Sequence, residues 1–188
     1  MNLARKEFIR KDGSGRSDSF VSFYEGGYIL KNLTTQFEKI QAYRLRHKIY
    51  CQELKWVPGS KNALEIDEYD SNAIFLGVFN KQNNLIGFLR LIGSEGPFMI
   101  EREFASLVGN EHKIRKENDA VEASRLCVLP EARDYALDGN FGVYRVSTLI
   151  YKGLYLCCLK NNVRYAYLVA EYKTFRSMRP ILRCEPIG

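Results

Sequence analysis

The stretch VEASRLCVLP, residues 121–130, combines the pattern of a buried strand with two charged side chains. Val121, Leu126 and Val128 are typical of a central strand. Burying a charge without a partner costs several kcal/mol, so Glu122 and Arg125 require partners from elsewhere in the chain. Charged groups at core positions concentrate at functional sites. The sequence therefore predicts a strand at about residues 120–128 that borders a reaction site.

The segments before this strand predict a helix and a hairpin. Residues 24–33, YEGGYILKNL, predict a first strand. A helix is expected to begin at Thr35, because Thr35 and Glu38 have the spacing of a capping box, and apolar residues at steps of three and four continue it to Leu54. AIFLGVF and LIGFLRLI predict the two strands of a hairpin, with the turn-prone NKQNN between them.

The segments after this strand predict a crossover helix and a further strand. Residues 140–160 are expected to form a helix, residues 164–171 a strand, and residues 172–182 a last helix interrupted at Pro180. A strand, a helix and a neighbouring strand give a parallel pair with a right-handed connection. We therefore expect an α/β (α+β) domain with a mixed, twisted sheet and flanking helices over residues 25–188, preceded by a polar, mobile arm at residues 1–24.

Composition limits the class of protein and of partner. The chain of 188 residues carries a net charge of +6 and has a pI of about 9.0, which favours an acidic partner. No nucleic-acid motif is present, and no apolar run approaches the roughly 20 residues of a membrane span. The first 20 residues lack the apolar stretch of a secretory signal, so we expect a cytoplasmic protein. Five cysteines without a C-x-x-C pair and only two histidines predict reduced thiols and no metal site.

Three sets of polar residues interrupt the apolar pattern. Arg46, Tyr50 and Trp56 lie around the end of the long helix, and Glu65, Asp67 and Asp70 precede the hairpin. The third set is Arg90 in the second hairpin strand, with Glu122 and Arg125 in the next strand. An arginine inside a core strand requires carboxylates, and Asp67 and Asp70 are available to Arg90. Each set alone is better explained by a buried ion pair that fixes a loop than by a functional site. Three sets in one domain favour a functional site.

The segments RHKIYCQELKW, EIDEYD, GFLRLI, PFMIEREF and VEASR occur here in an order and near-spacing that resembles the acyl-homoserine-lactone (autoinducer) synthases. The same segments are similar to those of the long-chain N-acyl amino acid synthases and of the acyltransferases associated with exosortase systems. The resemblance covers roughly residues 43–128 and implies the fold of the GCN5-related N-acyltransferases. The matching positions are Arg46, Tyr50, Trp56, Asp67, Asp70, Arg90, Phe104, Glu122 and Arg125.

Departures from the autoinducer synthase pattern decide which activity is expected. Those enzymes usually carry Phe where Tyr50 and Leu126 stand in this chain. We therefore expect an N-acyl amino acid synthase that transfers a long-chain fatty acyl group to the amine of an amino acid, such as tyrosine. The alternatives are an acyl-homoserine-lactone synthase that uses S-adenosylmethionine, a coenzyme-A-dependent N-acetyltransferase, and a catalytically silent lipid- or carrier-binding module.

The resemblance also implies the acyl donor. EARDYALDGNFG, residues 131–142, lacks the R/Q-x-x-G-x-G/A spacing with which related enzymes cradle the pyrophosphate of coenzyme A. We therefore expect the donor to be the phosphopantetheine arm of an acidic acyl carrier protein, with no permanently bound cofactor. Docking of this partner is assigned to five basic residues, Arg145, Lys152, Arg176, Arg179 and Arg183.

Amide formation from a thioester assigns a role to each remaining residue. The α-ammonium group must lose a proton, and Glu122, next to Arg125, is the candidate base. Backbone N–H groups of Leu126, Cys127 and Val128 are the candidate donors to the oxyanion. The substrate side of the site is assigned to Arg46, Tyr50, Trp56, Asp67, Asp70, Arg90 and Phe104.

Overall fold

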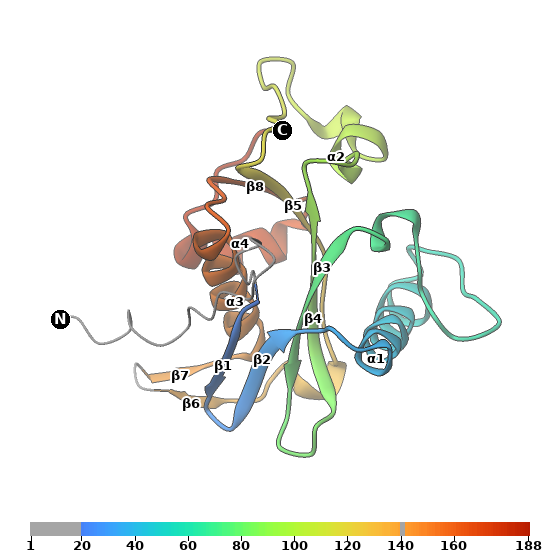
Figure 1. Ribbon diagram of the computed structural model, residues 1–188, viewed down its shortest axis with the longest axis vertical. Coiled ribbons are helices and arrows are strands. Elements are labelled where there is room, and N and C mark those ends of the chain that lie inside the picture. Colours follow the sequence, from blue (N-terminus) through green and yellow to red (C-terminus); the bar gives the residue numbers. More distant parts are fainter. Residues whose placement is uncertain (1–19, 140–141) are drawn as a thin grey trace, which may run out of the picture.

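In the computed structural model, which describes residues 20–139 and 142–188, six strands form one twisted sheet in the order β1-β2-β3-β4-β5-β8 (Figure 1). The first five strands pair antiparallel, and β8 pairs parallel with β5. This arrangement confirms the mixed sheet expected from the sequence. The strands are β1 (Ser22–Glu25), β2 (Tyr28–Asn32), β3 (Ala73–Phe79), β4 (Leu85–Gly93), β5 (Ala120–Val128) and β8 (Tyr165–Tyr167).

The helices follow the predicted order, with several short turns between them. The long helix α1 (Gln36–Arg46) continues without a break as the π-helix η1 (His47–Glu53). No described helix is long and apolar enough to cross a membrane. The other helical elements are η2 (Glu68–Asp70), α2 (Met99–Arg102), η3 (Ala105–Leu107), η4 (Pro130–Ala132), α3 (Val146–Lys160) and α4 (Tyr172–Leu182).

The two faces of the sheet carry separate cores, because side chains alternate along each strand. On β3, Phe75 and Phe79 pack with α1 residues such as Leu45. Leu76 and Val78 belong to the other core, which contains the apolar side of α3. The helices α1 and α3 therefore cover opposite faces, and the strands between them are buried on both sides (Figure 1).

Two predicted elements differ from the structure at glycines. Residues 24–33 form a hairpin rather than one strand, because Gly26 and Gly27 take φ values of +58° and +85° at its turn. Helix α3 begins at Val146 rather than at residue 140. Gly139 and Gly142 instead pair β6 (Leu137–Gly139) with β7 (Gly142–Tyr144).

Three boundaries are also adjusted. Strand β1 takes in residues 22–24, which were assigned to the predicted arm, while residues 1–19 lie outside the described part of the chain. Strand β8 is shorter than predicted and ends at Tyr167. Helix α4 is not interrupted at Pro180, which lies inside it, and continues to Leu182.

The start of α1 is fixed by the predicted capping box. The Thr35 hydroxyl accepts a hydrogen bond from the Glu38 N–H at 3.2 Å, and the Glu38 carboxylate accepts one from the Thr35 N–H at 3.0 Å. Loss of such a cap costs about 1 kcal/mol. This cap matters for function because α1 carries Arg46 and leads into Tyr50.

We predict that Thr35→Ala lowers the free energy of unfolding by about 1 kcal/mol, because the N–H group of Glu38 in the first turn loses its partner, the Thr35 hydroxyl. Urea unfolding followed by circular dichroism measures the change. Thr34→Ala is the matched control, since the exposed Thr34 contributes its backbone N–H and not its side chain to the cap. Equal stability of the two variants would contradict the prediction.

Candidate active site

Strand β8 pairs with only the first three residues of β5. The parallel register runs from Ala120 opposite Tyr165 to Glu122 opposite Tyr167, and β5 then continues alone to Val128. The part of β5 that follows Glu122 is therefore free of β8. This part of β5 carries Arg125 and the residues that follow it.

A β-bulge distorts the same part of β5. Phe88 of β4 lies opposite Cys127, but Arg90 lies opposite Ser124, so β5 carries one extra residue between these pairs. Arg125, inside the bulge, has a φ of +54°, in the left-handed region. A residue with a Cβ atom takes this conformation at a cost of roughly 1–2 kcal/mol. The surrounding contacts must hold it there.

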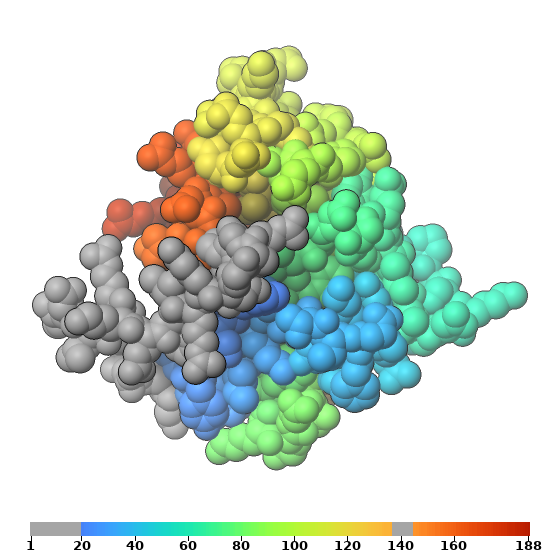
Figure 2. Space-filling view, in the orientation of Figure 1, coloured from blue at the N-terminus to red at the C-terminus, as the bar shows by residue number. Residues whose placement is uncertain are grey.

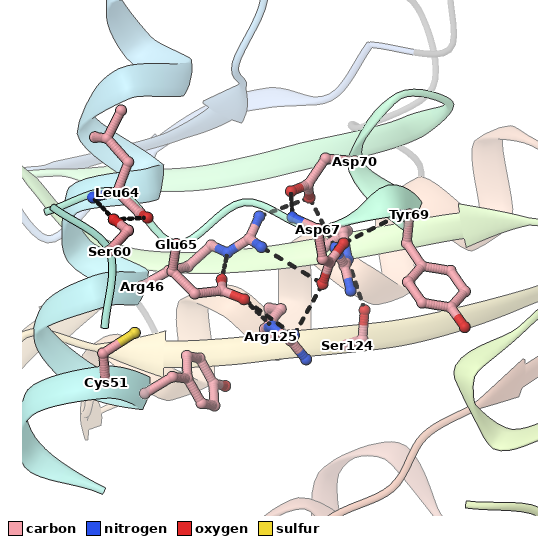
Figure 3. Close-up of polar contacts among 12 residues, drawn as sticks. Arg46, Cys51, Ser60, Leu64, Glu65, Asp67, Tyr69, Asp70, Ser124 and Arg125 are labelled. Atoms are coloured by element: carbon pink, nitrogen blue, oxygen red, sulfur yellow. Dashed lines mark hydrogen bonds and ion pairs between the residues drawn. The ribbon is translucent and has the colours of Figure 1, made fainter. Parts of the chain in front are cut away.

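Those contacts come from a set of three arginines and three carboxylates, which we call the arginine–carboxylate cluster (Figure 3). Arg46 and Arg90 both donate to Asp70 Oδ1, at 2.6 and 2.7 Å, and both are 0% exposed. Arg46 also pairs with Glu65, and Arg90 with Asp67. Arg125 donates to Glu65 Oε1 at 3.0 Å and to Asp67 Oδ2 at 2.8 Å. The members of the cluster are Arg46, Glu65, Asp67, Asp70, Arg90 and Arg125.

Pairing outweighs burial at the centre of the cluster. Burial alone would raise the pKa values of Glu65 and Asp70, but hydrogen bonds from Arg46 lower both below their usual range. Burial would likewise lower the pKa of Arg46, yet its bonds to Asp70 and Glu65 raise it. These groups are therefore charged in the folded protein. Three positive and three negative charges cancel, which permits burial.

The expected pairing of Arg90 with Asp67 and Asp70 is confirmed, and two further residues, to which the sequence assigned no role, support the cluster. Glu65, 4% exposed, joins Arg46 to Arg125. Its position two residues before Asp67 in EIDEYD was the available signal. Ser124 accepts a hydrogen bond from Arg90 Nε at 2.9 Å, and only the fold brings these two residues together.

Glu122 lies on β5 beside the cluster but has different partners. Its carboxylate accepts hydrogen bonds from the backbone N–H groups of Met99, at 2.5 Å, and Ile100, at 3.0 Å, at the start of α2. It is 1% exposed. Burial raises the pKa of Glu122 to about 7, although these N–H groups and Arg90 lower it. Glu122 is therefore divided between its two protonation states near neutral pH.

The predicted aromatic residues divide between three environments. The Tyr50 hydroxyl donates to the carbonyl of Leu126, at the bulge, at 2.8 Å. Trp56 packs against the Tyr50 ring with centroids 6.0 Å apart and is 54% exposed. It belongs to the segment after η1, coloured teal, which projects from the body of the molecule (Figures 1 and 2). Phe104 packs instead in the apolar cluster of Ile92 and Phe98.

The strand residues after the bulge have apolar surroundings. Leu126 and Val128 pack against the core on the α3 side, and Cys127 belongs to the core on the α1 side. Burial raises the pKa of the Cys127 thiol to about 12, so the thiol is protonated. The described cysteines are free, and in residues 20–139 and 142–188 no group of three or more potential ligands is placed to hold a metal ion.

The basic residues assigned to docking differ in their contacts: some pair with acidic side chains and others lie over aromatic rings. Lys152 is paired with Glu25 of β1, and Arg145 lies 3.7 Å from Asp134. On α4, the guanidinium of Arg176 lies over the ring of Tyr172, and that of Arg179 over the ring of Phe175. These four α4 residues and Pro180 line an open depression of about 530 Å³. Arg183 is exposed just after the end of α4.

Comparison with known protein families shows the family to which the chain belongs. The model of the family described as autoinducer synthase matches residues 31–171, which contain the whole arginine–carboxylate cluster. The chain belongs to the autoinducer synthase family. It is accordingly an enzyme of an acyltransferase family.

Two curated relatives of this chain are named acyl-homoserine-lactone synthase. The protein from Vibrio anguillarum is 27% identical over 156 residues, which cover 81% of this chain and 78% of the relative. The protein from Aliivibrio fischeri (strain ATCC 700601 / ES114) is 34% identical over 146 residues, covering 77% of this chain and 73% of the relative.

Solved structures agree with the fold. The structure of the CoA-dependent acyl-homoserine lactone synthase BjaI with MTA matches with a TM-score of 0.63 and 22% identity over 76% of this chain. The present chain spans 63% of the length of that protein. The structure of the AHL synthase LasI matches with a TM-score of 0.64 and 16% identity, covering 81% of this chain and 77% of LasI. At these identities the matches establish the GCN5-related N-acyltransferase-like fold alone.

The expectation of a long-chain N-acyl amino acid synthase is wrong. The family model and the named relatives are autoinducer and acyl-homoserine-lactone synthases, which favours the alternative stated with it. Tyr50 and Leu126 are the residues on which that expectation depends. Both are part of the bulge and its contacts, and their replacement of Phe does not separate this chain from the family.

We predict that Arg46→Met lowers the free energy of unfolding by about 3–5 kcal/mol, because Glu65 and Asp70 would remain buried without it. Lys48→Met is the matched control on η1. The exposed Lys48 pairs with Glu131 at 2.7 Å and should contribute less than about 1 kcal/mol. Denaturant unfolding measures both values, and equal losses would contradict the burial argument.

The raised pKa of Glu122 also predicts how stability depends on pH. The folded protein holds this proton up to about pH 7, whereas the unfolded chain releases it near pH 4.5. The cost of ionising the buried carboxyl is thus absent below about pH 4.5 and complete above about pH 7. Glu122→Gln should flatten the decline in unfolding free energy between pH 5 and 8. Glu95→Gln, at an exposed position, should leave the decline unchanged, and the same decline in all three proteins would contradict the assignment.

Proposed function

We propose that this autoinducer synthase is an acyl-homoserine-lactone synthase. In the proposed reaction, the amine of S-adenosylmethionine attacks the carbonyl of an acyl thioester, an amide bond forms and the thiol leaves. The carboxylate oxygen of S-adenosylmethionine then attacks the side-chain methylene carbon that is bonded to the sulfonium sulfur. This step closes the lactone ring, breaks the carbon–sulfur bond and releases methylthioadenosine. The observation that carries the proposal is the arginine–carboxylate cluster. It lies within the residues matched by the family model and pairs Arg125 of the bulged strand with Glu65 and Asp67.

The acceptor is assigned to the outer members of the cluster. Arg46 and Arg90 are completely buried, whereas the side chains of Asp67 and Arg125 are 20% and 13% exposed. S-adenosylmethionine carries a carboxylate that complements a guanidinium, and an ammonium and a sulfonium group that complement a carboxylate. Asp67 and Arg125 supply one group of each kind. The inner residues hold them in place.

Glu122 is the proposed base for the amine. A base works best when its pKa lies near the working pH, and that of Glu122 is raised to about 7 by burial. Each carboxylate oxygen accepts one backbone N–H and retains a second lone pair. A single water molecule between Glu122 and the amine would carry the proton. The proton then leaves with the thiol.

The oxyanion is assigned to the backbone of the bulge. Backbone N–H groups aimed at the developing charge are an effective means of stabilising a tetrahedral intermediate. The bulge places Leu126, Cys127 and Val128 where β5 no longer pairs with β8. We propose that the thioester lies along this free part of β5.

An acyl carrier protein is the proposed donor partner. The net charge of +6 favours an acidic protein. Arg176 and Arg179 are exposed on α4, line an open depression, and hold their guanidinium groups over the rings of Tyr172 and Phe175. Acyl-coenzyme A is the competing donor, and its use would require no docking surface for a partner protein.

In the decisive experiment, the purified protein is incubated with S-adenosylmethionine and one of two acyl donors, either acyl-acyl carrier protein or acyl-coenzyme A. Mass spectrometry detects acyl-homoserine lactone and methylthioadenosine. We expect both products from the wild type, and a loss of at least about 100-fold in turnover for Glu122→Gln. Absence of lactone with either donor would overturn the proposed function.

We further predict that Arg176→Glu/Arg179→Glu raises the KM for acyl-carrier protein at least about tenfold without changing kcat, because rim charges act on encounter. The KM for acyl-coenzyme A should stay the same. Arg44→Glu/Lys81→Glu is the control of equal charge change at other exposed sites. A similar increase in both double variants would show a general charge effect and contradict docking on α4.

A further inference from the structure

Tyr50 makes a contact that the proposed roles do not use. Its hydroxyl donates to the Leu126 carbonyl at 2.8 Å, although Tyr50 belongs to η1 and Leu126 to β5. The side chain is 8% exposed. Burial raises the pKa of the Tyr50 hydroxyl, so the group keeps its proton and remains a donor.

The accepting carbonyl lies beside the register shift of the bulge. The register between β4 and β5 shifts next to Leu126, and β8 has already ended its pairing. A bulge disrupts the ladder of hydrogen bonds locally. Because a peptide group is planar, fixing the direction of the Leu126 carbonyl also fixes that of the Cys127 N–H. The Tyr50 hydroxyl therefore sets one peptide plane of the bulge.

Tyr50 also contacts the residue that gives the bulge its shape. The guanidinium of Arg125 lies 5.4 Å from the centroid of the Tyr50 ring. The same guanidinium is held by Glu65 and Asp67, while the Arg125 backbone takes the left-handed conformation. The ring packs against one bulge residue and the hydroxyl bonds to the next. A phenylalanine would keep the first contact and lose the second.

We propose that Tyr50 is a positioning residue for acyl transfer, whose hydroxyl holds the Leu126–Cys127 peptide and with it the shape of the bulge that binds the oxyanion. This role rests on the proposed function, in which the bulge binds the thioester. It assigns the Tyr50 hydroxyl to the rate of the chemical step rather than to substrate affinity.

The test compares Tyr50→Phe with Tyr151→Phe. Tyr151 is a matched control because it is buried, 3% exposed, and its hydroxyl makes a 3.0 Å hydrogen bond to Ser177 on the far side of the fold. Two measurements are made on each protein. Hydrogen–deuterium exchange measures the exchange rate of the backbone amides in the peptide that spans residues 121–129 and contains most of β5. Kinetics follow thiol release from the donor, with lactone formation measured separately.

We expect Tyr50→Phe alone to raise amide exchange in this peptide about fivefold or more. We also expect kcat to fall about tenfold while both KM values stay within about twofold. Unchanged exchange, or faster exchange with unchanged kcat, would overturn the positioning role. So would an equal loss of kcat in Tyr151→Phe. A wild type that releases thiol but forms no lactone would overturn the proposed function instead, and the exchange and thiol-release rates would still decide the role of Tyr50.

Discussion

The burial of three guanidinium groups against three carboxylates determines the rest of this structure. Each charge would be prohibitively costly alone, so the chain must bring α1, the segment before β3, β4 and β5 to one place. The pairing fixes the end of α1 relative to the sheet. It also holds Arg125 in its left-handed conformation and with it the bulge in β5. The fold and the candidate site therefore have the same physical origin.

Charge neutrality separates this cluster from Glu122, which lies on the same strand. The carboxylates of the cluster are ionised because arginines surround them. Glu122 has backbone N–H groups as its hydrogen-bond partners, and its burial outweighs them. One site thus contains carboxylates that remain charged and one that exchanges a proton near neutral pH. The first kind suits binding of a charged acceptor, and the second suits proton transfer.

Local patterns predicted much of the fold and only part of the candidate site. The capping box at Thr35 and the apolar run of β5 depend on neighbouring residues, and both are readable in sequence. The hairpin turn at Gly26 was not predicted, because the sequence of residues 24–33 is compatible with either one strand or a hairpin. The hydrogen bonds of Glu122 to the start of α2 and of Tyr50 to Leu126 join distant segments, so no spacing rule reveals them. The choice between related activities depended on family comparison rather than on single residues.

The central claim is that the bulge and the arginine–carboxylate cluster form one reaction site. A crystal structure with S-adenosylmethionine and a non-reactive acyl-pantetheine thioether measures this most directly. We expect the acceptor to bind against Asp67 and Arg125, and the pantetheine to lie along β5 beyond Glu122. Ligands bound elsewhere, with no contact to the cluster or the bulge, would contradict it.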